Sequence, residues 1–146
     1  MEQDRKFNNL PSTGALAYLG DARHSLYVRE LLVRRGLSHS GDLNRASLSF
    51  VTAESQAKMV EKILPIMTEC EMGVYRRASN SKHLNKPKGR SGRDYRAATG
   101  FEAVIGMLYL VGEEERLAYL LEICHKDLNE KLYGTENGDI KNDTED

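Results

Sequence analysis

The 146-residue sequence has no tryptophan, only three prolines and only two cysteines. Apolar residues rarely alternate with polar ones, and this absence argues against a β-sandwich. No apolar run approaches the ~20 residues that are needed to cross a bilayer. The amino-terminal Met-Glu-Gln-Asp-Arg-Lys also lacks the apolar core of a signal peptide. We therefore expect a cytoplasmic protein that does not bind membranes.

The cysteines and histidines show no metal-ligand spacing. Cys70 and Cys124 stand alone in helical patterns, so we expect both to be free thiols in a reducing compartment. The four histidines have no regular spacing with one another or with the cysteines, which argues against a zinc site. The length suits a single domain, and 40% apolar and 29% charged residues are typical of a globular protein.

The net charge of −1 conceals two blocks of opposite sign. Between Arg76 and Arg96, eight lysines and arginines stand against one acid, Asp94, which gives this basic block a charge of +7. Residues 136–146 hold five acids and one lysine, which gives −4. Such blocks predict a surface that faces a polyanion and a solvated acidic tail. A charged linker is the alternative interpretation of the basic block.

The composition of the basic block favours duplex RNA over single strands. Only Tyr75 and Tyr95, at its edges, could stack on bases, whereas lysine, arginine, serine and asparagine suit contacts to phosphates and sugars. Binding would then weaken steeply as salt rises. The residues expected to contact RNA are Arg76, Arg77, Asn80, Lys82, Lys86, Lys88, Arg90 and Arg93.

The apolar periodicity predicts an all-α domain of about six or seven helices over residues 11–133. A flexible arm (1–10) precedes this domain, and a disordered acidic tail (134–146) follows it. Expected helix starts are marked by Ser12 or Thr13, by Thr52, by a Thr68–Glu71 capping box, and by Ser91 with Asp94. The predicted helices span about residues 14–35, 43–51, 53–64, 69–78, 95–111 and 113–133.

Two of these helices have predicted core stripes. In the first helix the stripe is expected to follow Leu16, Leu19, Ala22, Leu26 and Val33, and to be widened by Tyr18, Val28, Leu31 and Leu32. Gly20 interrupts this helix, and a glycine there is expected to permit the close approach of another backbone. In the helix that follows the basic block, the expected core residues are Phe101, Val104, Ile105 and Leu108.

One acid interrupts each of these two apolar runs. Asp21 lies in Leu16–Arg23 and Glu102 lies in Thr99–Gly106. An acid is rarely buried unless it is paired, hydrogen-bonded or bound to a metal. Asp21 alone could cap a helix or pair with the nearby arginine, but two half-buried acids on two apolar helices indicate a shared metal site. Mg²⁺ suits such a site, because it takes one or two protein oxygens and keeps most of its waters.

The same residues carry a resemblance to a known family. Leu19-Gly20-Asp21-Ala22 and Phe101–Leu110 resemble, in order and in separation, the two acidic motifs of the ribonuclease III catalytic domain. Three features are similar to its small Mini-III branch: the run from Ala15 to Asp21, the Arg76–Asn80 segment, and a chain that ends without a double-stranded-RNA-binding domain. The resemblance implies the helical fold of that catalytic domain.

The resemblance also implies an activity. It implies a homodimeric, Mg²⁺-dependent endoribonuclease that cuts both strands of duplex RNA and leaves 5′-phosphate and 3′-hydroxyl ends. Asp21 and Glu102 match the catalytic, metal-binding acids, and Tyr18 matches an aromatic residue at the dimer interface. The implied substrate is the precursor of 23S ribosomal RNA, and a large-subunit ribosomal protein is a further candidate partner.

Two positions depart from full-length ribonuclease III, which usually has acids where this chain has Ala17 and Thr99. Each subunit then offers two carboxylates, which leaves more of the metal shell to water and phosphate. These two residues also favour an alternative, a catalytically degenerate RNA-binding or ribosome-assembly module of the same fold. A helical protein-interaction domain without RNA affinity is a third interpretation.

Overall fold

The computed structural model describes residues 6–81 and 92–126, which form α-helices, one short 3₁₀ helix and no strand. The all-α prediction is confirmed. The first five residues, the middle of the basic block and the acidic tail lie outside the described residues. No helix within the described ranges is long and apolar enough to cross a membrane. The helices are α2 (Thr13–Arg34), α3 (Ser40–Phe50), α4 (Ala53–Ile63), η1 (Leu64–Ile66), α5 (Glu69–Ser79), α6 (Gly92–Leu110) and α7 (Glu114–Cys124).

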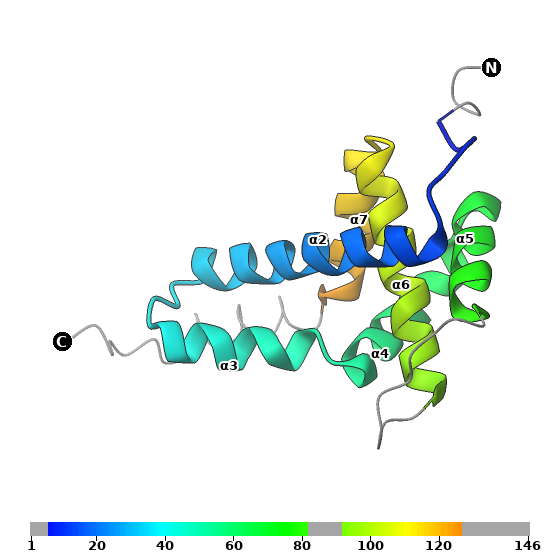
Figure 1. The fold of residues 1–146 in the computed structure, drawn as a ribbon. Helices are drawn as coiled ribbons and strands as arrows, with labels where there is room; N and C mark the ends of the chain where they lie inside the picture. The colour runs from blue at the N-terminus through cyan, green and yellow to red at the C-terminus, as the bar shows by residue number, and fades with distance from the viewer. Residues whose placement is uncertain (1–5, 82–91, 127–146) are drawn as a thin grey trace.

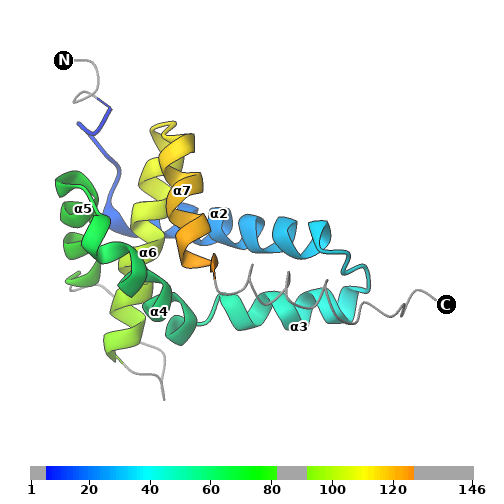
Figure 2. The same ribbon diagram turned by 180° about the vertical axis from the view of Figure 1, so that it is seen from behind.

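Helix α6 runs through the middle of the molecule, and α2, α4, α5 and α7 pack around it (Figures 1 and 2). An apolar surface on nearly every side is typical of a buried central helix. The predicted core residues of this helix are confirmed, since Phe101, Val104, Ile105 and Leu108 are all at most 1% exposed. The helix that carries Glu102 is thus the central element of the hydrophobic core.

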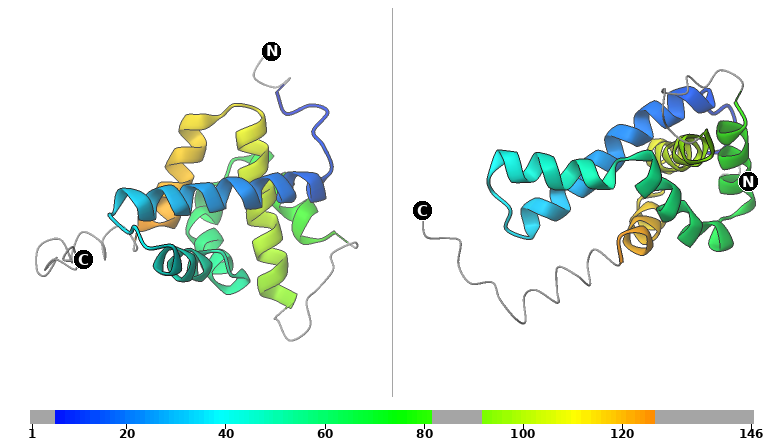
Figure 3. Two further views of the ribbon diagram at one scale, coloured as in Figure 1. Left: turned by 60° about the vertical axis from the view of Figure 1, so that its left-hand side comes forward. Right: turned by 90° about the horizontal axis from the view of Figure 1, so that it is seen from below.

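Helix α2 crosses α6 and continues beyond it, and α3 returns alongside this extension (Figure 3). The predicted stripe of α2 is confirmed at Leu16, Val28 and Leu32, but it is wrong at Leu26 and Val33, which are 58% and 59% exposed. The buried row instead follows every fourth residue and includes a glycine and a histidine, neither of which counts as apolar in the sequence pattern. This row is Leu16, Gly20, His24, Val28 and Leu32.

Two glycines allow the backbones of α2 and α6 to touch where the helices cross. A Cβ atom on Gly20 would lie 1.6 Å from the backbone oxygen of Glu102, and one on Gly106 would lie 1.9 Å from that of Leu16. The expected close approach at Gly20 is therefore confirmed. This crossing, rather than any side-chain contact, sets the distance between residue 21 of α2 and residue 102 of α6.

Side-chain caps begin three of the helices as predicted. Ser12 and Thr52 accept hydrogen bonds from the first turns of α2 and α4, and Thr68 forms the predicted capping box with Glu71. The predicted cap at Asp94 is wrong, because α6 already begins at Gly92, and the other predicted cap, Ser91, lies outside the described residues. Asp94 therefore lies in the first turn of α6, where a negative charge interacts favourably with the helix dipole.

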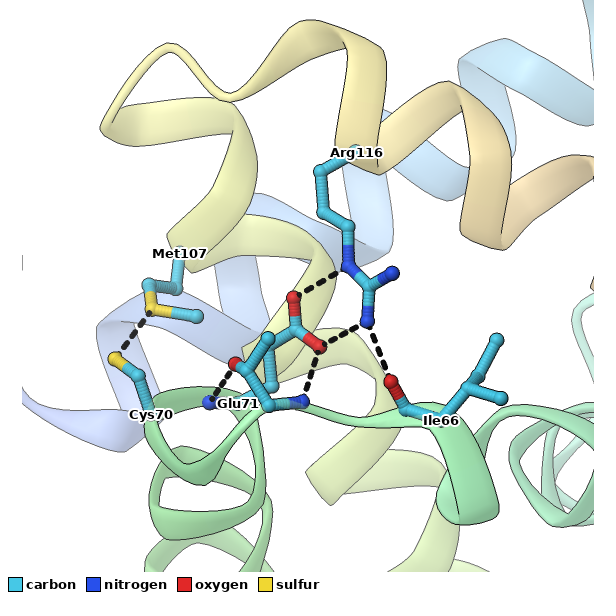
Figure 4. Close-up of polar contacts among 6 residues, drawn as sticks. Ile66, Cys70, Glu71, Met107 and Arg116 are labelled. Carbon is cyan, nitrogen blue, oxygen red and sulfur yellow. Dashed lines mark hydrogen bonds and ion pairs between the residues drawn. The ribbon is translucent and has the colours of Figure 1, made fainter.

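A buried ion pair joins α7 to the start of α5 (Figure 4). The Glu71 side chain is 3% exposed and accepts hydrogen bonds from Arg116 Nε at 3.0 Å and Nη2 at 2.9 Å. Glu71 also accepts from the backbone N–H of Thr68, and Arg116 Nη2 donates to the carbonyl of Ile66. One carboxylate thus satisfies both a helix cap and an arginine from another helix.

We expect Arg116→Met to lower the free energy of unfolding by about 3 kcal/mol, because it leaves the Glu71 carboxylate buried without its cation. The expected fall in melting temperature is roughly 10 °C for a chain of this size. Thermal unfolding monitored by circular dichroism measures it. The matched control is Arg34→Met, which breaks an exposed pair with Glu30 and should cost less than about 0.5 kcal/mol. Equal losses in the two variants would contradict the role of the buried pair.

Candidate active site

The helix crossing brings Asp21 and Glu102 together, as the sequence predicted. Their carboxyl groups are hydrogen-bonded, and burial followed by the nearby charge of Asp21 raises the pKa of Glu102 to about 9. Only Glu102 is half-buried, whereas Asp21 is exposed, so the expectation of two half-buried acids is wrong for Asp21. Asp21 lies on the solvent side of the α2 crossing, where a ligand can reach it.

The other interpretations of Asp21 find no support in the geometry. Asp21 is in the interior of α2, so it does not cap the helix. Arg23 instead places its guanidinium carbon 5.9 Å from the centre of the Tyr109 ring, and its Nη1 atom is buried without a hydrogen-bond partner among the described residues. The Asp21 carboxyl group therefore interacts with Glu102 and not with the neighbouring arginine.

The two carboxyl groups fit a hard divalent cation. Two neighbouring carboxylates cannot both ionise at low cost, so in the absence of a cation the raised pKa of Glu102 keeps this carboxyl group protonated near neutral pH. A cation that takes the place of this proton relieves the repulsion. Two oxygen ligands leave most of an octahedral shell to water and phosphate, as Mg²⁺ prefers. Within residues 6–81 and 92–126, no group of three or more histidines, cysteines and acids comes together as a zinc site requires.

The positions that depart from full-length ribonuclease III add no charge to this pair. Ala17 is half-buried on α2. The Thr99 hydroxyl donates to the backbone oxygen of Tyr95 at 2.9 Å, so it is engaged within its own helix. The site therefore has the two carboxylates that the sequence predicted.

The predicted RNA-binding residues that the structure describes are exposed around the ends of α5 and α6. Arg76 and Arg77 lie in the last turn of α5, Asn80 follows this helix, and Arg93 lies in the first turn of α6. The predicted interface residue Tyr18 is 85% exposed on α2. Four of the predicted RNA-binding residues lie outside the described residues: Lys82, Lys86, Lys88 and Arg90.

A buried chain of polar side chains next to the carboxyl pair was missed by sequence reasoning. Gln56 Nε2 lies 3.3 Å from His24 Nδ1, and His24 Nε2 lies 3.0 Å from His125 Nε2. If the amide donates to His24, then His24 carries its proton on Nε2 and donates it to His125. Both imidazoles are then neutral. Burial lowers the pKa of His24 to about 3 and that of His125 to about 4.

This histidine pair predicts acid lability. Below pH 6.5 the histidines of the unfolded chain bind protons, whereas those of the folded chain stay neutral down to about pH 4, so protonation favours unfolding. We expect the free energy of unfolding to fall by about 2 kcal/mol from about pH 7 to about pH 5.5. Urea denaturation at several pH values measures this fall. The experiment uses the Glu102→Gln background, because the raised pKa of Glu102 makes the folded protein more stable as the pH falls over the same range.

A second histidine substitution in that background tests the cause of this pH dependence. Adding His24→Leu should roughly halve the dependence, because His125 remains buried. Adding His39→Gln should leave it intact, because His39 is exposed on the surface. Loss of the dependence with His39→Gln, or its undiminished persistence with His24→Leu, would show that other groups cause it.

Comparisons with known proteins agree with this fold. The family model of the ribonuclease III domain matches residues 14–113. The chain therefore belongs to the ribonuclease III family, a family of endoribonucleases, which confirms the resemblance seen in the two acidic motifs. It is 45% identical over 107 residues to Mini-ribonuclease 3 of Symbiobacterium thermophilum, which covers 73% of this chain and 82% of that protein.

A further relative carries the same name, and a solved structure shares the fold. The chain is 42% identical over 108 residues to Mini-ribonuclease 3 of Thermoanaerobacter sp., covering 74% of this chain and 76% of that protein. A crystal structure of a Fusobacterium nucleatum protein superimposes with a TM-score of 0.73 at 30% identity, covering 82% of this chain and 95% of that chain. In each comparison the similarity thus extends over most of this chain and most of the compared protein.

Proposed function

We propose that this chain is a Mg²⁺-dependent endoribonuclease that cleaves double-stranded RNA as a homodimer. The observation that carries the proposal is the hydrogen-bonded pair of Asp21 and Glu102, which two helices in backbone contact hold together. This pair offers two hard oxygen ligands, and Glu102 lies on the helix whose first turn carries the exposed Arg93. Metal ligands on the same helix as part of a cationic surface suit hydrolysis of a nucleic-acid phosphodiester.

The roles of the residues follow from their exposure. Asp21 is open to a phosphate that arrives from solvent, and the half-buried Glu102 anchors the inner side of the site. The chemistry that a bound divalent cation supplies at such a pair is polarisation of the phosphodiester and activation of a water molecule. The water oxygen joins phosphorus and the bond to the 3′ oxygen breaks, which gives the 5′-phosphate and 3′-hydroxyl ends.

A second copy of the chain would complete the cleavage of a duplex. One subunit with one pair of acids cuts one strand, whereas two subunits related by a two-fold axis place two sites across a helix of matching local symmetry. The exposed Tyr18, one turn before Asp21 on α2, is the proposed interface residue. Two basic surfaces would then bind the same RNA and increase its effective affinity.

The finer proposal concerns the natural substrate. The similarity to Mini-ribonuclease 3 proteins supports maturation of the paired ends of the 23S ribosomal RNA precursor, with a large-subunit ribosomal protein as candidate partner and the cytoplasm as location. Extracts that lack this protein should then accumulate precursor with unprocessed ends.

A substrate panel tests the proposed activity. We expect cleavage of perfect duplex RNA with Mg²⁺, and none of single-stranded RNA, duplex DNA or duplex RNA in EDTA. Duplex binding without cleavage would select the degenerate RNA-binding module that Ala17 and Thr99 favour. The absence of both binding and cleavage would select a protein-interaction domain.

Neutralising Arg76 and Arg77 together should weaken duplex binding and reduce the slope of log K against log salt by about two, roughly one for each lost phosphate contact. Fluorescence anisotropy over a salt series measures this slope. The matched control neutralises Arg34 and Arg45, which lie on α2 and α3 away from α5 (Figure 1). Equal slopes for the parent and both variants would show that α5 does not contact the RNA.

A further inference from the structure

A cavity of about 990 Å³ lies between α4, the end of α5 and the start of α6. Its wall includes apolar residues of α4 and two tyrosines, Tyr75 from α5 and Tyr95 from α6. The sequence places these tyrosines twenty positions apart, at the two edges of the basic block. The fold brings them to one cavity, and the space is large enough for a small organic ligand.

The position of Tyr75 is fixed by its packing. A Cβ atom on Gly100 would lie 2.6 Å from Tyr75 Cδ2, so only a glycine at this position of α6 leaves room for the ring. Tyr75 and Tyr95 are both half-buried. A tyrosine ring held partly open in a cavity wall offers a surface on which a planar base can stack.

The mouth of the cavity carries cations that suit a phosphate. Lys58, Arg93 and Arg96 line it and are exposed, and none of them forms an ion pair with another described residue. Glu54, Glu61 and Asp94 line it as well. Carboxylates repel a phosphate but accept hydrogen bonds from the exocyclic amino groups of bases. The lining thus combines groups for a base and groups for a phosphate.

The cavity lies in line with the carboxyl pair. Tyr95, Thr99 and Glu102 follow one another at helical spacing on one face of α6. Seven residues of helix span about 10 Å, roughly the length of three base steps. An RNA strand with a phosphate at Glu102 can therefore present a nucleotide a few positions away to the cavity.

We propose that this cavity binds one unpaired nucleotide, with an amino-bearing base stacked on Tyr95, in the wall that Tyr75 also lines, and its phosphate held by Lys58, Arg93 or Arg96. The inference rests on the proposed function for the source of the nucleotide, which is a bulged position of the duplex substrate. A free nucleotide has the same chemistry and is the other source to be distinguished. The cavity would thus direct cleavage to duplexes with an unpaired base close to the cut.

Binding is measured in EDTA, so that the result does not depend on cleavage. The full chain is titrated against a duplex of about two turns and against the same duplex with one unpaired cytidine. We expect at least about fivefold tighter binding of the bulged duplex, as the loss of one base–aromatic stack would predict. In Tyr95→Ala the ratio should fall to about one. The matched control Tyr119→Ala, an exposed tyrosine on α7, should retain the parent ratio.

Two further arms identify the source of the nucleotide. A 5-iodocytidine at the unpaired position should crosslink to Tyr75 or Tyr95 on irradiation, and with Mg²⁺ the cut should fall about three base pairs away. Equilibrium dialysis with cytidine monophosphate tests the free nucleotide. If cytidine monophosphate binds the parent and not Tyr95→Ala, while the parent shows no preference for the bulged duplex, then the cavity binds a free nucleotide and not an unpaired base of the duplex.

The two proposals fail in different ways. Equal affinity for both duplexes, together with no binding of cytidine monophosphate, overturns the nucleotide cavity whether or not the RNA is cut. Absence of cleavage with Mg²⁺ contradicts the proposed activity. The ratio of the affinities for the bulged and the perfect duplex still shows whether the cavity binds a nucleotide.

Discussion

Glu102→Gln is expected to lower cleavage of duplex RNA by about 10³-fold, because several kcal/mol of stabilisation by the metal ion are lost when an anionic ligand becomes neutral. The fold should remain. In the absence of a cation the raised pKa of Glu102 keeps this carboxyl protonated near neutral pH, and glutamine has nearly the same shape as a protonated glutamate. The variant should therefore melt in EDTA no earlier than the parent. Asp21→Asn should lose activity to a similar extent.

Cleavage rates measure the loss of activity, and melting with and without Mg²⁺ measures the loss of metal binding. Mg²⁺ should raise the melting temperature of the parent, because a ligand that binds only the folded state stabilises it, and this increase should disappear in Glu102→Gln. The matched control is Glu122→Gln, an exposed position on α7, which should cut like the parent. Glu102→Gln cutting at the parent rate would show that the acids are not the catalytic ligands.

Gly20→Ala is expected to destabilise the protein by more than about 3 kcal/mol, which exceeds the cost of overpacking an ordinary core position. Its Cβ atom would lie 1.6 Å from the backbone oxygen of Glu102 and 2.8 Å from the backbone nitrogen of Gly106. Neither atom belongs to a side chain that can rotate away, so the two helices must separate. The helix propensity of alanine returns only about 1 kcal/mol.

The matched control for this substitution lies on the same helix. Gly14→Ala adds the same methyl group in α2, but at a position where no atom lies within 4 Å of the new Cβ. It should therefore stabilise the protein by about 0.5 to 1 kcal/mol. Urea denaturation of both variants measures the two effects. A urea midpoint that rises in both variants would show that the helices do not cross in backbone contact.

The sequence predicted the site because its signals are local. Gly20 marks a close approach by its lack of a side chain, Asp21 follows it directly, and Glu102 interrupts the most apolar helix of the chain. The caps at Ser12 and Thr52 are equally local, since each hydroxyl bonds to a backbone N–H three residues later. Short-range patterns of this kind are enough to predict where the helices begin and which acids interrupt apolar runs.

Other features depend on contacts between distant residues. His24 and His125 are 101 positions apart, and neither has a sequence neighbour that indicates the other. Glu71 matches a capping box, but its second partner, Arg116, comes from another helix. The row of α2 that faces the core includes Gly20 and His24, whose burial depends on what α6 and α7 place against them. Apolar periodicity could not identify these positions.

The crossing of α2 and α6 also determines how the site of Asp21 and Glu102 comes apart when the protein unfolds. Both acids lie on long helices whose backbones touch at two buried glycines. Amide hydrogens around Asp21 and Glu102 should therefore exchange only through global unfolding, unlike those of sites built on loops. Heating should not produce a folded protein with a disassembled site. Metal-binding capacity and helical structure should disappear in a single transition.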